Sequence, residues 1–183
     1  MKVAIVIGST REGRASEVVA KWVTAEASKL TKATVDVLDL RDYAMPFFDE
    51  VMPPQFSENR TLHPEVKKWL ETLAKYDTFV FVTPEYNHSM PAVLKNAIDY
   101  VDFQLKEKRA LIVGHGPSGG ASDAMSHLRT VLTSSIGMEV VEPGVSLKTM
   151  VAMGGVFDEP GTLLQSDNTW EDDLKTGLET LFK

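Results

Sequence analysis

The sequence predicts an α/β fold in which helices cover both faces of a five-stranded parallel sheet. Five short apolar runs alternate along the 183 residues with segments whose apolar residues recur at helical spacing. A strand buried on both faces has such a continuous apolar sequence, and alternation with helices is typical of parallel sheets. Polar, glycine-containing loops follow the first, third and fourth runs, at the end of the sheet where such folds bind ligands.

The runs expected to form strands are residues 3–7, 35–40, 78–82, 110–113 and 137–141. Apolar residues at spacings of three and four then mark five helix faces: Val19, Trp22, Val23, Ala27 and Leu30; Val66, Trp69, Leu70 and Leu73; Leu94, Ala97, Ile98 and Val101; Ala121, Ala124, Met125, Leu128 and Leu132; Trp170, Leu174, Leu178 and Leu181. Pro84 is expected to end the third strand, and Ser89 or a neighbour to cap the helix after it. Residues 143–168 are expected to form a loop with a turn at 160–161.

Composition narrows the class of protein. The net charge of −7 argues against nucleic acid or an anionic membrane as the main partner. The chain has no cysteine, which excludes disulfides, thiol catalysis and thiolate metal sites. The apolar runs are far shorter than a membrane span, and the first is too short for a signal peptide. We therefore expect a cytoplasmic protein with one domain over residues 1–183.

The loop after the first strand has the composition of an anion site. Its glycines let the backbone approach a ligand, and its hydroxyl and guanidinium groups can donate to a phosphate: the donors are Ser9, Thr10, Arg11, Arg14 and Ser16. The loop matches neither the Walker sequence nor the Gly-x-Gly-x-x-Gly of dinucleotide folds. On these residues alone, a tight turn with solvent-facing arginines is an equally good interpretation.

Two further loops are expected beside it. In the sheet order 2-1-3-4-5 the first, third and fourth strands are neighbours, and their loops meet at one crevice. The residues that these loops contribute are Pro84, Glu85, Tyr86, Asn87, His88 and Ser89, then His115, Gly116, Gly119 and Gly120. The histidines are scattered without metal-ligand spacing, so we expect no metal, and a lone carboxylate such as Glu85 is more often structural than a general base. The crevice suits a flat, phosphorylated cofactor that carries its own chemistry.

Three segments resemble the NADPH-dependent FMN reductase family: residues 8–14, 84–100 and 116–120. The resemblance covers nearly the whole chain in the right order, and Pro-Glu-Tyr-Asn leading into Leu-Lys-Asn-Ala-Ile-Asp is its most specific part. It implies the flavodoxin-like three-layer α/β/α fold, FMN as cofactor and NAD(P)H as reductant. The implied reaction is hydride transfer from NAD(P)H to N5 of FMN, then reduction of a small-molecule acceptor such as a quinone, free flavin, azo dye or chromate. No catalytic side chain is required, because the flavin does the redox work.

The resemblance also implies roles for residues. Ser9, Arg11, Arg14 and Ser16 would hold the FMN phosphate, residues 84–89 would line the isoalloxazine, and the loop from His115 would close the other side. Many members have a small hydroxyl residue at the position of Arg14, so its contact with phosphate, solvent or a partner subunit stays open. Members are commonly homodimers or homotetramers. The segment 44–56 and the helix from Pro91 are candidate contacts, with packing within the chain as the alternative.

A different class of protein is the main alternative. A flavodoxin-type electron carrier also binds FMN but exchanges electrons only with protein partners. Such carriers usually hold the phosphate with a longer Ser/Thr-rich loop, whereas this loop contains two arginines. A flavodoxin-like module that has lost flavin is a third possibility. NAD(P)H reactivity separates the first two, and a colourless preparation would favour the third.

Overall fold

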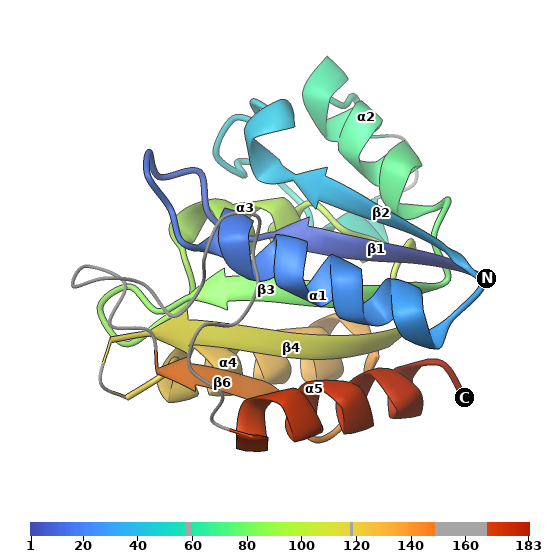
Figure 1. Cartoon of the computed structure of the whole chain (residues 1–183). Helices are drawn as coiled ribbons and strands as arrows, with labels where there is room; N and C mark the ends of the chain where they lie inside the picture. The colour runs from blue at the N-terminus through green and yellow to red at the C-terminus, as the bar shows by residue number, and fades with distance from the viewer. Residues whose placement is uncertain (58–59, 118, 149–167) are drawn as a thin grey trace.

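The computed structural model describes residues 1–57, 60–117, 119–148 and 168–183 (Figure 1). All its strand pairings are parallel, in the order β2-β1-β3-β4-β5, with β6 also paired to β4. The strands are β1 (Lys2–Ile7), β2 (Thr34–Asp39), β3 (Thr78–Pro84), β4 (Arg109–Gly116), β5 (Glu139–Val140) and β6 (Val145–Lys148). The predicted α/β class and the predicted order of the first five strands are confirmed.

Helices cover both faces of this sheet. They are α1 (Ser16–Leu30), α2 (Pro64–Leu73), α3 (Ala92–Asp99), α4 (Ser122–Thr130) and α5 (Asn168–Leu181). Figure 1 shows α1 and α5 on the near face and α3 and α4 behind the strands. Among the described residues, no helix is long and apolar enough to cross a membrane.

The core consists of two apolar layers separated by the sheet. Side chains of a strand alternate between its faces, so neighbouring residues enter different layers. Ile5, Val80 and Leu111 pack with α1 and α5, whereas Phe79 and Phe81 pack with α2, α3 and α4. All five side chains are almost completely buried. Burial on both faces explains why the central strands read as continuous apolar runs.

The third strand ends at Pro84, as predicted, although Thr83 and Pro84 still belong to it. Pro84 is the last residue of β3 and pairs with His115 of β4. The ladder tolerates this because the next N–H, that of Glu85, donates to the His115 carbonyl oxygen at 3.1 Å. The N-cap of α3 is Pro91, which makes no side-chain capping bond. Ser89 is therefore not a helix cap, and its hydroxyl is hydrogen-bonded to His127 at 3.1 Å.

Beyond β4 the described residues form two short strands, β5 and β6, where the sequence predicts one. The strand expected at 137–141 shrinks to β5, which pairs with the start of β4. Pro143, which has no N–H to donate, and Gly144 interrupt it. The chain then rejoins the end of β4 as β6, within the stretch that was expected to be a loop. The predicted turn at 160–161 lies outside the described residues.

Candidate functional site

The loops after β1, β3 and β4 meet at the carboxyl ends of their strands, on the left in Figure 1. The Ser9 hydroxyl is hydrogen-bonded to the Tyr86 phenol at 2.8 Å, which joins the first loop to the loop after β3. The Ser16 hydroxyl is hydrogen-bonded to Nε2 of His115 at 2.8 Å, which joins the start of α1 to the end of β4. The predicted convergence of the three loops at this end of the sheet is therefore observed.

The first loop leaves a helix N-terminus without a side-chain cap. Gly8 extends the contact between β1 and β3, since its N–H donates to the Val82 carbonyl oxygen at 2.8 Å. The N-cap of α1 is Ala15, which has no side chain able to accept a hydrogen bond. The first N–H groups of α1 therefore have no side-chain acceptor at the N-cap, which favours an anion at this end of the helix. The side chains of Thr10 and Arg11 are exposed beside it.

The Arg14 side chain is buried inside its own chain, which was not among the environments expected from the sequence (phosphate, solvent or a partner subunit). Its side chain is only 2% exposed, and both terminal nitrogens donate to the carboxylate of Asp39, the last residue of β2. Nη1 also donates to the Ser9 carbonyl oxygen. Because these contacts engage its terminal nitrogens inside the protein, they favour a supporting role for Arg14 over direct binding of the phosphate. Its only group without a partner among the described residues is the buried Nε.

The electrostatics of Asp39 follow from this pair. Burial by itself would raise the pKa of the Asp39 carboxyl. The hydrogen bonds from Arg14 and from the backbone of Arg41, together with the charges of both arginines, outweigh burial and lower that pKa below its ordinary value. Asp39 is therefore ionised at neutral pH, as an ion pair with Arg14 requires.

Arg41 also contacts the loop, and the sequence interpretation missed it. Its guanidinium donates to the carbonyl oxygens of Thr10 at 3.3 Å and Arg11 at 2.6 Å. Backbone acceptors leave no pattern in a sequence, so the side chain alone could not reveal this contact. The available signal was positional, because Asp39 and Arg41 lie at the end of β2, the neighbour of β1 in the predicted order.

The loop after β3 contains a tight reverse turn. Tyr86 and Ser89 exchange two backbone hydrogen bonds of 2.8 and 3.0 Å. Asn87 and His88 between them have φ values of 49° and 61°, the left-handed pair that a type I′ turn requires. Both of their side chains are exposed, and His88 Nδ1 lies 2.7 Å from the Asp123 carboxylate. The turn is thus fastened to the start of α4.

Glu85 has a structural role at the same junction. Its carboxylate accepts the backbone N–H groups of Asp123 at 3.0 Å and Ala124 at 3.1 Å, and so caps α4. Glu85, His88 and Asp123 each offer a ligand atom within 4.8 Å of the others. The helix cap and the His88–Asp123 contact account for this proximity without an ion. The structural interpretation of Glu85 is the one that its hydrogen bonds support.

The loop after β4 depends on glycine. A Cβ on Gly116 would lie 1.8 Å from the carbonyl oxygen of Gly120, so this loop folds back against its own backbone. Gly120 has a φ of 68°, and a Cβ there would lie 2.1 Å from the Ser146 hydroxyl. Gly119, in contrast, is exposed and open. His115 beneath them is buried, which lowers its pKa to about 4 and keeps the imidazole neutral at pH 7.

The three loops lie at the switch point of a doubly wound sheet, where such folds bind their ligands. Residues 1–151 match the family described as NADPH-dependent FMN reductase. The chain belongs to this family.

Similar proteins cover most of the chain. An NAD(P)H-dependent FMN reductase of Saccharomyces cerevisiae is 36% identical over 160 residues, which are 82% of each chain. A quinone reductase of Escherichia coli is 31% identical over 174 residues, 89% of this chain and 88% of the relative. For an NAD(P)H-dependent FMN reductase of Schizosaccharomyces pombe, 35% identical over 71% of this chain, the match spans 64% of the relative's length.

Solved structures support the fold. The flavoenzyme NAD(P)H:(acceptor) oxidoreductase FerB of Paracoccus denitrificans superposes with a TM-score of 0.73 over 98% of this chain and 94% of its own, at 21% identity.

Family membership gives FMN as the cofactor, with NAD(P)H, as predicted from the sequence. The residues present fit that group. The uncapped start of α1 and the exposed Arg11 suit the phosphate. In the loop after β4, the exposed Gly119 has open space where a Cβ would stand, so a flat ring can approach the backbone there. The observed contacts thus suit both ends of the cofactor.

Proposed function

We propose that this protein is an NAD(P)H-dependent flavin oxidoreductase that passes electrons to a small-molecule acceptor. The observation that carries the proposal is the linkage of three loops, through Ser9–Tyr86 and Ser16–His115, at the carboxyl ends of their strands. Bound FMN supplies the redox chemistry, by accepting a hydride from NAD(P)H and releasing electrons. The names of the relatives favour a quinone or an azo dye as acceptor; free flavin and chromate remain further predictions.

The chain would contribute binding and orientation rather than acid–base chemistry. Arg11, Thr10 and the first N–H groups of α1 would hold the phosphate, with the Tyr86 loop and the glycine loop on opposite sides of the ring. Two groups that could act as bases are occupied: His115 is buried with Ser16, and Glu85 caps α4. This supports the expectation that no catalytic side chain is needed. A single domain over residues 1–183 and a cytoplasmic location likewise stay predictions.

The visible spectrum of the FMN-loaded protein tests this function. Anaerobic addition of NADPH or NADH should bleach the flavin band rapidly, and a quinone added afterwards should restore it. A yellow protein that neither nucleotide reduces would overturn the reductase proposal and favour the electron carrier. Failure to bind FMN would contradict the site itself.

We also propose that the protein forms a homodimer through the segment 47–56 and α3. Large apolar side chains of this segment point into solvent, with Phe47 79%, Val51 98% and Phe56 75% exposed. Other parts of the segment are packed within the chain. The ring of Phe48 meets Tyr100 edge-on at 5.2 Å. A segment that is fixed in place yet exposes apolar groups is typical of an interface.

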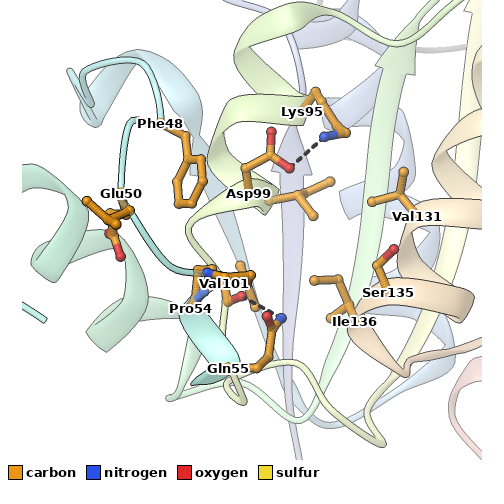
Figure 2. A pocket seen from close by; sticks show the side chains of 13 residues that line it. Phe48, Glu50, Pro54, Gln55, Lys95, Asp99, Val101, Val131, Ser135 and Ile136 are labelled. Atoms are coloured by element: carbon orange, nitrogen blue, oxygen red, sulfur yellow. Dashed lines mark hydrogen bonds and ion pairs between the residues drawn. The ribbon is translucent and has the colours of Figure 1, made fainter. Parts of the chain in front are cut away.

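The segment lines a surface cavity that side chains of a second copy of this chain could fill. Figure 2 shows this cavity of about 510 Å³, with Phe48 on one side, Val131 and Ile136 on the other, and the Lys95–Asp99 pair at its margin. Two sets of contacts hold its outer wall. Asn96 of α3 binds the backbone on both sides of Phe47. Arg60 forms a two-pronged contact with Glu50 and also binds Asp102.

Val51→Asp should separate such a dimer. A charge at a position 98% exposed in the monomer does not disturb its core but would be buried without a partner in the interface. Light scattering during size exclusion should show the wild type at twice the monomer mass and the variant at the monomer mass. Val37→Asp, at an exposed valine of β2, is the matched control and should leave the mass unchanged. A monomeric wild type would contradict the proposal.

A further inference from the structure

Three consecutive carbonyl groups of the first loop are bound by guanidinium groups. The carbonyl oxygen of Ser9 accepts from Arg14 Nη1. The next two, of Thr10 and Arg11, accept from Nε and Nη2 of Arg41 at 3.3 and 2.6 Å. Both arginines lie beside the end of β2, the neighbour of β1 on one side. The carbonyls of this stretch are therefore drawn toward β2.

One carboxylate holds both arginines in place. Asp39 accepts both terminal nitrogens of Arg14, with Nη1 at 2.8 Å from Oδ1. The same Oδ1 accepts the backbone N–H of Arg41 at 2.9 Å, which fixes where the Arg41 side chain starts. Because Arg14 is 2% exposed and its terminal nitrogens are used, it acts on the loop from within the protein. Asp39 is the common point of the network.

The orientation of these carbonyls determines that of the N–H groups. In a planar trans peptide, C=O and N–H point in opposite directions. Three carbonyls drawn toward β2 turn the N–H groups of Thr10, Arg11 and Glu12 the other way. One of them can be followed directly: Arg11 N–H points to the Ser9 hydroxyl at 3.3 Å, and this hydroxyl bonds to Tyr86 beyond β3. β3 lies on the far side of β1 from β2, so the N–H groups face the crevice.

We infer that Asp39 is a positioning residue for the FMN phosphate: through Arg14 and Arg41 it turns the N–H groups of residues 10–12 toward the crevice. Successive N–H groups with this common direction form a concave anion site. The inference rests on FMN as the cofactor of the proposed function. In this inference Arg14 and Arg41 support the loop, whereas the exposed side chain of Arg11 contacts the phosphate directly.

Because Asp39 is negatively charged, a positioning role and simple charge repulsion predict opposite changes in FMN affinity for Asp39→Asn. A carboxylate near a phosphate repels it, so by Coulomb's law alone Asp39→Asn should tighten FMN binding. If Asp39 positions the loop, the same change releases both arginines and FMN binding weakens. Arg11→Ala cannot make this distinction, because loss of a positive charge weakens phosphate binding in either case.

The experiment compares FMN with riboflavin, which lacks the phosphate, by fluorescence titration of the flavin-free full-length protein. Asp39→Asn should raise the dissociation constant of FMN by about tenfold and change that of riboflavin by less than about twofold. Asp42→Asn is the matched control. It removes an equal charge from an exposed residue that does not contact the loop arginines, and should not weaken FMN binding.

Two results would overturn the inference. One is FMN binding by Asp39→Asn that is as tight as in the wild type or tighter. The other is equal weakening of FMN and riboflavin, which would indicate general damage to the site. If Asp39→Asn fails to fold, Arg41→Lys decides by the same ratio, because it keeps the positive charge but loses the guanidinium that binds two carbonyl groups at once. Failure of the reductase proposal is separate, since it would appear as wild-type protein that binds FMN and is not reduced by NAD(P)H.

Discussion

Gly116→Ala is expected to disrupt the loop after β4 and to destabilise the protein by about 1–3 kcal/mol. Its new Cβ would lie 1.8 Å from the carbonyl oxygen of Gly120 and 2.9 Å from the carbonyl carbon. Both are backbone atoms, so the clash cannot be relieved by turning a side chain. The loop must move away from the crevice, and FMN affinity should fall by at least about tenfold, equivalent to 1.4 kcal/mol. Denaturant unfolding of the flavin-free protein and FMN titration measure the two effects.

Gly119→Ala provides the matched control within the same loop. A Cβ at Gly119 meets no atom within 4 Å, and the residue is exposed. The expected change in unfolding free energy is within about 0.5 kcal/mol. Gly120→Ala would be less informative, because a left-handed φ and a clash with Ser146 act there together. If Gly116→Ala behaves like Gly119→Ala, the loop does not need the close backbone approach, and its role as one wall of the site is refuted.

The sequence predicts the fold well where the determinants are local. β1, β3 and β4 are buried on both faces, so each is an uninterrupted apolar run. The helix faces are equally regular: Val66, Trp69, Leu70 and Leu73 are the four buried residues of α2. From these elements the order of strands follows, and with it the meeting of three loops. Where an element is only two to four residues long, as in β5 and β6, no periodicity can develop and the prediction fails.

The site is less predictable because its contacts join distant residues. Arg14 is a plausible phosphate ligand until Asp39, 25 positions away, is known to lie beside it. Arg41 binds backbone carbonyls, which every residue possesses and no motif records. Glu85 caps a helix that begins 37 residues later, at Ser122. The residue types in a loop therefore indicate what kind of ligand it binds. Which of these residues contact the ligand and which hold the loop in place depends on tertiary packing.

Stability is expected to rise with pH across the weakly acidic range because of His115. Its pKa is about 4 in the folded protein, where burial disfavours the charged form, against 6.5 when solvated. Between these values the unfolded chain binds a proton that the folded protein does not, so lowering the pH favours unfolding. From about pH 7.5 to about pH 4.5 this group alone should remove about 2–3 kcal/mol, with no further loss once the folded form is protonated.

His115→Gln isolates this contribution. The amide keeps a group able to hydrogen-bond to Ser16 but does not titrate, so the variant should lose less stability than the wild type over the same pH interval. Asp39, whose pKa is lowered in the folded state, also loses stabilisation as the pH falls, but equally in both proteins, so it cancels in the difference. An unchanged slope in His115→Gln would mean that the imidazole is solvated in the folded protein, and the Ser16–His115 link between α1 and β4 would then have to be abandoned.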